Sequence, residues 1–179
     1  MLLNDAIQLI DCNELSEQPG MWTDLGCGDG LFTFALANLL LPGSTIYAID
    51  KEPVKLLSRA NPNHINVVGK SVDFVKEDIL ADNLSGILMA NSLHFVEDKL
   101  ALIEKLGKAL RDNGYFVIVE YDTIKANSWV PYPIDFKRLT TLFDQAGYKF
   151  SRKLGERPSV YGNYNIYSAI FSKQEMNLH

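Results

Sequence analysis

The sequence predicts an α/β fold with a mostly parallel, seven-stranded sheet, helices on both faces and an antiparallel terminal strand pair. Three observations support this prediction. Short apolar runs alternate with segments of helical periodicity, an order typical of a parallel sheet. The first run ends in a glycine-rich turn that leads directly into an apolar helix. The last two runs have only turn residues between them, which favours antiparallel pairing.

The expected elements follow in chain order. Helical spacing predicts helices over residues 2–10, 31–41, 54–60, 98–110 and 135–145. Apolar runs predict strands over residues 21–25, 45–49, 65–73, 86–90, 115–119, 148–153 and 165–172. Residues 75–85 are expected to form a short helix or a loop, and the proline-rich stretch 127–133 an irregular segment. Asp112-Asn113-Gly114 is expected to form the turn into the fifth strand.

Length and composition narrow the class of protein. A chain of 179 residues, 47% hydrophobic and 22% charged, is typical of one folded domain over residues 1–179. A net charge of −5 argues against a nucleic-acid partner. Residues 31–49 carry no charge, but Pro42 and Gly43 divide them, so no membrane span is expected. Two cysteines without metal-ligand spacing indicate a reduced, cytoplasmic protein with no metal site.

The glycine-rich turn predicts a ligand site. Gly26, Gly28 and Gly30 stand at alternate positions, where they allow positive φ and leave no Cβ between the backbone and a ligand. The free N–H groups at the start of the next helix would face that ligand. A second strand ends about 20 residues later at Asp50, where an acid commonly accepts hydrogen bonds from ribose hydroxyls. The pattern predicts a site for a nucleoside-containing cofactor.

Two cofactor classes use such a turn. The dinucleotide fingerprint is G-x-G-x-x-G, whereas the spacing here is G-x-G-x-G, with Asp24 before it and Asp29 inside it. Carboxylates would repel a pyrophosphate but would suit a cationic sulfonium or ammonium group. The sequence Asp24-Leu25-Gly26-Cys27-Gly28-Asp29-Gly30 resembles the first motif of class I S-adenosylmethionine-dependent methyltransferases. A nicotinamide-dependent oxidoreductase is the alternative.

The resemblance extends over roughly residues 20–172 and implies a Rossmann-like methyltransferase fold. It divides the chain into an N-terminal helix and loop (1–20), a cofactor-binding core (21–123) and a C-terminal helix and strand pair (124–179). The residues that it implies for binding S-adenosylmethionine and its product S-adenosylhomocysteine are Asp24, Gly26, Cys27, Gly28, Asp50, Lys51, Asp73, Phe74 and Asn91.

Three of these residues have specific roles in the resemblance. Asp50 matches the ribose-binding acid, Lys51 the residue that flanks the adenine, and Asn91 the position whose backbone lies near the methionine part of the cofactor. Members of the family usually have an acid after the third strand that contacts the adenine amino group. Asp73 fits this acid by its distance to the fourth strand, and Asp78 is the competing candidate.

Candidate catalytic residues follow the fourth and fifth strands. Ligands of open α/β sheets gather beyond the carboxyl ends of the strands, which places His94 and Tyr121 near the transferred methyl group. His94 is interpreted as a general base or as a histidine packed under the next helix. Tyr121 is interpreted as lining the acceptor pocket or as packing against the sheet edge. Residues 129–132 are expected to form an apolar lid or a packed connection.

The expected function is in-line methyl transfer from S-adenosylmethionine to a small-molecule acceptor. The chain lacks an Asn/Asp-Pro-Pro-Tyr/Phe tetrad after the fourth strand, which argues against methylation of amino groups on DNA bases or glutamine. One alternative is a non-catalytic S-adenosylmethionine-binding protein or partner subunit of the same fold. Another is modification of RNA or protein, of which the acidic balance disfavours RNA. The sequence leaves the acceptor atom and the oligomeric state open.

Overall fold

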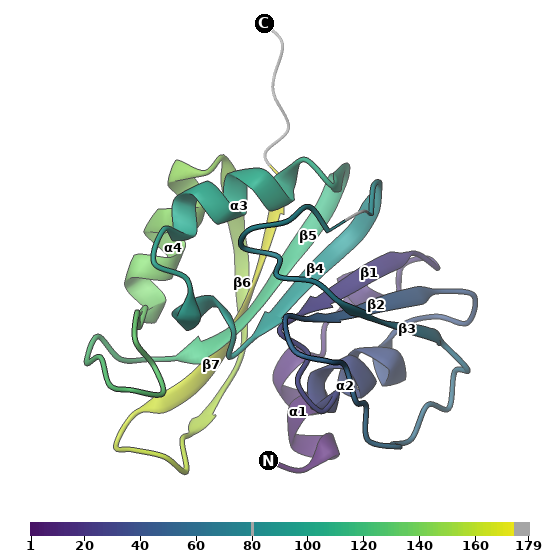
Figure 1. Ribbon diagram of the computed structural model, residues 1–179, viewed down its shortest axis with the longest axis horizontal. Helices are drawn as coiled ribbons and strands as arrows, with labels where there is room; N and C mark the ends of the chain where they lie inside the picture. Colours follow the sequence, from purple (N-terminus) through teal and green to yellow (C-terminus); the bar gives the residue numbers. More distant parts are fainter. Residues whose placement is uncertain (80, 174–179) are drawn as a thin grey trace, which may run out of the picture.

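The computed structural model describes residues 1–79 and 81–173 and places a seven-stranded sheet at the centre of the chain (Figure 1). The strands are β1 (Met21–Leu25), β2 (Thr45–Asp50), β3 (Asn66–Ser71), β4 (Leu84–Ala90), β5 (Leu110–Tyr121), β6 (Tyr148–Pro158) and β7 (Asn165–Lys173). The helices are α1 (Leu3–Ile10), α2 (Leu31–Leu39), α3 (Lys99–Gly107) and α4 (Phe136–Gln145).

The strands lie in the order β3-β2-β1-β4-β5-β7-β6. Strands β1 to β5 pair in parallel, and β7 runs antiparallel to both β5 and β6. The predicted class is therefore confirmed, with its antiparallel pair at one end of the sheet. The strand order changes direction between β1 and β4, and such a switch point is where open α/β sheets bind ligands.

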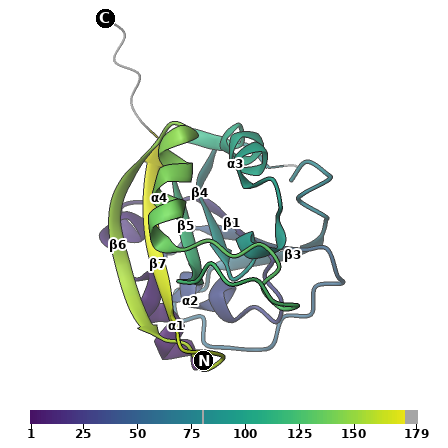
Figure 2. The same ribbon diagram turned by 90° about the vertical axis from the view of Figure 1, so that its left-hand side faces the viewer.

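Helices cover both faces of the sheet, as Figures 1 and 2 show, with α1 and α2 on one face and α3 and α4 on the other. The apolar side chains of the central strand β4 account for helices on both faces, because the strand is buried along its whole length. Ile87 and Met89 join the core under α3 and α4, whereas Leu88 and Ala90 join the core under α1 and α2. Successive side chains of a strand point to opposite faces, so one apolar run supplies two cores.

The helix predicted over residues 54–60 is wrong, because this segment is irregular in the structure. The Leu57 N–H donates to the carbonyl oxygen of Asp29 at 2.9 Å. The Arg59 guanidinium donates to the same carbonyl at 2.6 Å and to Asp29 Oδ2 at 2.8 Å. An isolated helix of seven residues would have little stability. The contacts with the glycine turn therefore determine the conformation of residues 54–60.

Several boundaries also differ from the prediction. Strand β6 continues to Pro158 and includes Gly155, so the connection to β7 is shorter than expected. Its pairing with β7 shifts register between Phe150 and Arg152 and again between Lys153 and Gly155. Strand β5 begins at Leu110 and takes in the predicted turn at residues 112–114. Residues 75–79 and 81–83 are irregular, whereas Leu84 and Ser85 already belong to β4. Leu80 and residues 174–179 of the predicted C-terminal segment lie outside the described residues. None of the described helices has the length and apolar character required to cross a bilayer.

We expect Gly86→Ala to destabilise the fold, because a Cβ at this position would overlap the buried ring of Trp22 on the neighbouring strand. Overpacking of this kind costs about 1–3 kcal/mol. Gly147→Asn is the matched control, because Gly147 ends α4 at φ 81° with open space around it, and asparagine tolerates that conformation. Urea unfolding measures both variants, and equal losses of unfolding free energy would contradict the prediction.

Candidate functional site

The glycine turn joins β1 to α2 and draws three strand ends together. The N–H groups of Gly26 and Cys27 both donate to the carbonyl oxygen of Ile49 at the end of β2, at 2.8 and 3.0 Å. Gly26, Gly28 and Gly30 have φ of 79°, 52° and 86°, a region that side chains other than glycine rarely adopt. A Cβ on Gly26 would also lie 2.5 Å from the Cβ of Ser92 after β4. The turn therefore requires the glycines that the sequence places there.

The carboxylate of Asp50 lies directly beside this turn. Its Oδ2 accepts a hydrogen bond from the Gly28 N–H at 3.0 Å, and its Oδ1 accepts one from the Glu52 N–H at 3.1 Å. A Cβ built on Gly28 would meet no atom within 4 Å, so the backbone borders open space. Lys51 is exposed next to Asp50. These features leave room for a ligand next to an acid, as a ribose site requires.

A second acid, Asp24, is buried beneath the turn, with 1% of its surface exposed. Thr33 on α2 donates to its Oδ2 at 2.6 Å. Burial raises the pKa of Asp24 to about 7, and the charge of Asp50 adds to the rise despite the hydrogen bond from Thr33. A cation close to Asp24 would favour its ionised form. Sequence reasoning missed Thr33, because nothing in an apolar helix marks it as a partner for a distant acid.

Asn91 lies where β4 ends and has φ of 54°, a conformation that asparagine tolerates better than most residues. Its N–H donates to Val119 of β5 at 2.8 Å. Its side-chain Oδ1 is buried, and no described residue hydrogen-bonds to it. A buried acceptor without a partner is costly, so this atom is suited to a hydrogen-bond donor on a ligand. Next to it, Ser92 Oγ donates to the Leu25 carbonyl at 2.6 Å and fixes β4 to β1.

The other candidate cofactor residues occupy different positions. Asp73 follows β3 at the same sheet edge as Asp50 and accepts hydrogen bonds from Val75 N and Lys76 Nζ. Phe74 beside it is buried. Asp78 lines a separate cavity with Leu106 at the end of α3, so its position favours Asp73 as the adenine contact. Burial raises the pKa of the Cys27 thiol to about 12, which favours the protonated thiol over the thiolate near neutral pH.

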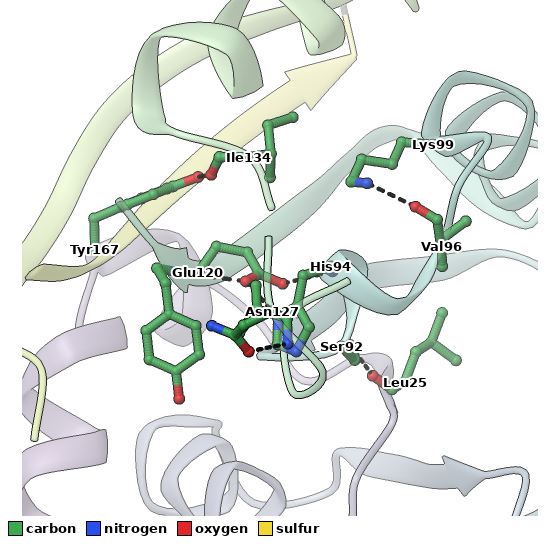
Figure 3. Close-up of polar contacts among 11 residues, drawn as sticks. Leu25, Ser92, His94, Val96, Lys99, Glu120, Asn127, Ile134 and Tyr167 are labelled. Carbon is green, nitrogen blue, oxygen red and sulfur yellow. Dashed lines mark hydrogen bonds and ion pairs between the residues drawn. The ribbon is translucent and has the colours of Figure 1, made fainter. Parts of the chain in front are cut away.

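His94 and Glu120 form a buried pair after β4 and at the end of β5, and Figure 3 shows them side by side. Glu120 Oε1 accepts from the His94 N–H at 3.0 Å, and Oε2 lies 2.8 Å from His94 Nδ1. A carboxylate at this nitrogen fixes the tautomer with the proton on Nδ1. Nε2 is then the acceptor nitrogen, and the described residues offer it no hydrogen bond. Sequence reasoning did not pair Glu120 with His94, because 26 residues separate them along the chain.

A cavity of about 670 Å³ opens beside this pair. Asn91, His94 and Tyr121 line it from the ends of β4 and β5, and three connections between strands or helices supply the other lining residues, namely Phe95, Asn127, Trp129, Val130, Tyr161 and Tyr164. The rings of His94 and Tyr121 lie 5.8 Å apart, and those of Tyr121 and Tyr164 lie 5.5 Å apart. Of the two interpretations of Tyr121, its position in this wall supports the pocket-lining one.

The connection between β5 and α4 closes one side of the cavity. Trp129 lines the cavity but is 81% exposed, while Val130 beside it is buried. The Tyr132 N–H donates to the His94 carbonyl at 2.9 Å. The Tyr167 hydroxyl donates to the Ile134 carbonyl at 3.0 Å, as Figure 3 shows. The connection is therefore packed at Val130 and Ile134 and hydrogen-bonded at Tyr132, as one interpretation predicts. Trp129 borders the cavity, whereas its role as a lid stays a prediction.

A hollow of similar size, about 680 Å³, lies between α3 and α4. Charged side chains line it, among them Glu97, Lys99, Lys137 and Arg138. It touches neither the glycine turn nor Asn91. The cavity beside His94, in contrast, is lined by Asn91, which directly follows β4. This cavity is therefore the better candidate for an acceptor site next to a bound cofactor.

The strand order, the turn and the two acids are typical of α/β proteins that bind a nucleoside cofactor at the switch point of the sheet. Residues 23–116, just over half of the chain, match the family model described as a methyltransferase domain, and the chain belongs to this family. A comparison with curated proteins finds no match.

Solved structures share the fold. The chain resembles the 1,6-didemethyltoxoflavin-N1-methyltransferase of Burkholderia thailandensis, solved with its substrate and S-adenosylhomocysteine, with a TM-score of 0.73 and 15% identity over 97% of this chain and 78% of that one. It resembles the magnesium protoporphyrin IX methyltransferase of Synechocystis PCC 6803, solved with S-adenosylmethionine, with a TM-score of 0.66 and 15% identity over 96% and 78% of the two chains. An S-adenosylmethionine-dependent methyltransferase of Aquifex aeolicus gives a TM-score of 0.63 and 18% identity over 97% and 100%.

These findings confirm the predicted family and the Rossmann-like fold of S-adenosylmethionine-dependent methyltransferases. They also confirm the predicted enzyme class and S-adenosylmethionine as its cofactor. They favour this class over the nicotinamide-dependent alternative. The residues that bind the cofactor and the identity of the acceptor stay predictions.

We expect Asp24→Asn to change how stability depends on pH. Burial raises the pKa of Asp24 in the folded protein to about 7, above the ordinary value of 3.8 for this side chain, so this residue costs stability as pH rises from about 4 to about 7. The asparagine variant should be more stable at pH 8 by at least about 1 kcal/mol, or about 2–4 °C in Tm, and the gain should vanish at pH 4. Thermal melts across this range test it, with exposed Asp144→Asn as the control. Parallel curves for Asp24→Asn and the wild type would contradict it.

Proposed function

We propose that this protein transfers a methyl group from S-adenosylmethionine to a small molecule held in the cavity beside His94. The observation that carries the proposal is the position of Asn91, which lines this cavity while its neighbour Ser92 bonds to the Leu25 carbonyl and packs against Gly26 of the turn. Two of the similar structures are named for small-molecule acceptors, a toxoflavin precursor and a protoporphyrin. We infer the same broad acceptor class here.

The residues around the turn fit the cofactor. Asp50 would accept hydrogen bonds from the ribose hydroxyls, and the open backbone at Gly28 leaves room for them. The buried, unpartnered Oδ1 of Asn91 would accept a hydrogen bond from the ammonium of the methionine part. Asp24 and Asp50 together supply negative charge that suits a cation. Lys51, Asp73 and Phe74 would border the adenine.

When bound, S-adenosylmethionine supplies an electrophilic methyl group on a positively charged sulfur. The chain contributes alignment and proton transfer. The walls of the cavity hold the acceptor in line with the methyl group, and such alignment is a large part of catalysis in displacement reactions. His94 serves as the general base through Nε2, with Glu120 as its positioning residue. General-base catalysis typically contributes about 10²–10⁴-fold.

The alternative is a protein of the same fold that binds the cofactor without catalysis. The His94–Glu120 pair supports the catalytic proposal, since a buried histidine with one ring nitrogen anchored by a carboxylate and the other free is arranged to accept a proton. Transfer of radiolabelled methyl groups to any compound of a cell extract would exclude the alternative.

Titration calorimetry with S-adenosylmethionine and S-adenosylhomocysteine tests the cofactor site. We expect micromolar binding, near −8 kcal/mol, and a loss of at least tenfold in Asp50→Ala, because the variant loses hydrogen bonds to a charged acceptor. Exposed Asp144→Ala is the control for a general loss of charge. If the folded wild-type protein binds neither S-adenosylmethionine nor S-adenosylhomocysteine, the proposed function is wrong.

The same titration separates the two adenine candidates. Asp73→Asn should weaken binding of S-adenosylhomocysteine by about tenfold, the usual effect of one hydrogen bond to a charged group, whereas Asp78→Asn should leave it unchanged. Circular dichroism checks that the turn after β3, which Asp73 stabilises, stays folded. The opposite pattern would assign the adenine contact to Asp78.

A further inference from the structure

The cavity beside His94 has no charged walls. Asp, Glu, Lys and Arg are absent among the residues that line it in the described part of the chain. Glu120 lies behind His94 and is nearly fully buried. A charged acceptor would lose its hydration in this cavity without gaining a partner of opposite charge, which is costly. The walls therefore select a neutral molecule.

The walls are also unusually aromatic, and they come from three parts of the fold. Tyr121 and Tyr164 form the inner wall with His94. Trp129 on the β5–α4 connection and Tyr161 on the β6–β7 connection stand at the cavity with 81% and 78% of their surfaces exposed. Large exposed aromatic side chains at a cavity are typical of a binding site, because flat rings offer faces on which another ring can stack.

The neutral polar residues at the cavity are Asn91, Asn127, three tyrosines and His94, and among these His94 is the residue whose ring is paired with a buried carboxylate. Nε2 of His94 can accept a hydrogen bond, since Nδ1 already donates to Glu120. An acceptor molecule with an N–H or O–H group would satisfy Nε2, whereas one without such a group would leave it unpaired. A site with a fixed hydrogen-bonding group discriminates strongly against an analogue that lacks the matching group.

We propose that the methyl acceptor is a neutral, planar aromatic molecule whose N–H or O–H group donates to Nε2 of His94. This inference rests on the proposed function of the same site. The acceptor's N or O lone pair forms the bond to the methyl carbon, and the carbon–sulfur bond breaks with its electron pair left on sulfur. The acceptor proton passes to Nε2, and the histidinium that forms is balanced by the Glu120 carboxylate.

Calorimetry with four matched probes tests the acceptor class, with the protein saturated with S-adenosylhomocysteine. 2-Naphthol is planar, neutral and carries an O–H group. Decahydro-2-naphthol is the saturated control, 2-naphthoate the anionic control, and 2-methoxynaphthalene the control without a donor. We expect 2-naphthol to bind at least about tenfold more tightly than each of the other three. A control that binds as tightly as 2-naphthol would overturn the corresponding part of the proposal, as would no binding of 2-naphthol.

Variants locate the binding and test the role of Nε2. Trp129→Ala and Tyr161→Ala should each weaken 2-naphthol binding by about 3–10-fold, whereas Ile124→Ala, an exposed apolar residue of the same connection outside the cavity lining, should not. In Glu120→Gln, the amide oxygen should keep the shorter backbone hydrogen bond, from the His94 N–H at 3.0 Å, rather than the one from the Tyr121 N–H at 3.3 Å. The amide N–H would then donate to Nδ1 and move the ring proton to Nε2. The preference for 2-naphthol over 2-methoxynaphthalene should then fall at least fivefold. An unchanged preference would overturn the assignment of Nε2.

The cofactor titration separates the two levels of inference. If S-adenosylhomocysteine does not bind, the proposed function fails and the acceptor class fails with it. If S-adenosylhomocysteine binds and the probe pattern is absent, only the acceptor class is overturned. Retained binding of S-adenosylhomocysteine by Glu120→Gln shows that this variant is folded.

Discussion

The convergence of three strand ends on one glycine turn is the constraint on which the rest of this structure depends. The carbonyl of Ile49 accepts from two consecutive N–H groups of the turn, and Ser92 Oγ bonds to the carbonyl that ends β1. A Cβ at Gly26 would collide with Ser92. Because β1, β2 and β4 meet this closely, Asp50 at the end of β2 and Asn91 directly after β4 come to the same edge of the sheet.

Charge is distributed unevenly along this edge. Asp24 and Asp50 lie at the turn, where a cationic group is favoured, and Asp24 is buried so deeply that its pKa rises to about 7. The neighbouring cavity has aromatic walls without charged side chains. A positively charged methyl donor and a neutral acceptor would therefore each find a suitable environment, and Asn91 lies at the boundary between them.

The pairing of β4 with β5 brings His94 and Glu120 together as a buried pair beside the cavity. Parallel register places Ala90 beside Val119, so the residues that follow these two strands come together beyond their ends. His94 then meets Glu120 through both its backbone N–H and its ring. The pair is thus a product of strand register, and the antiparallel β7 on the other side of β5 brings in Tyr164.

Much of the fold could be predicted from local patterns. Alternating strands and helices, the glycine turn and the acid after the second strand depend on residues near in sequence, where backbone conformation and periodicity are readable. The helix expected over residues 54–60 failed because Arg59 and the Leu57 N–H bond to Asp29, a contact across about 30 residues that no local pattern encodes. Propensity is weak compared with such tertiary contacts.

The candidate site divides in the same way. The sequence by itself determined the family motif, the acid at position 50 and the position of His94 after the fourth strand. Only the tertiary structure decided that Thr33 bonds to Asp24, that Glu120 holds His94, and that Trp129 and Tyr161 border one cavity. The physical reason is that hydrogen bonds and cavities form between side chains from different strands and loops, and their partners are selected by packing in three dimensions rather than by spacing along the chain.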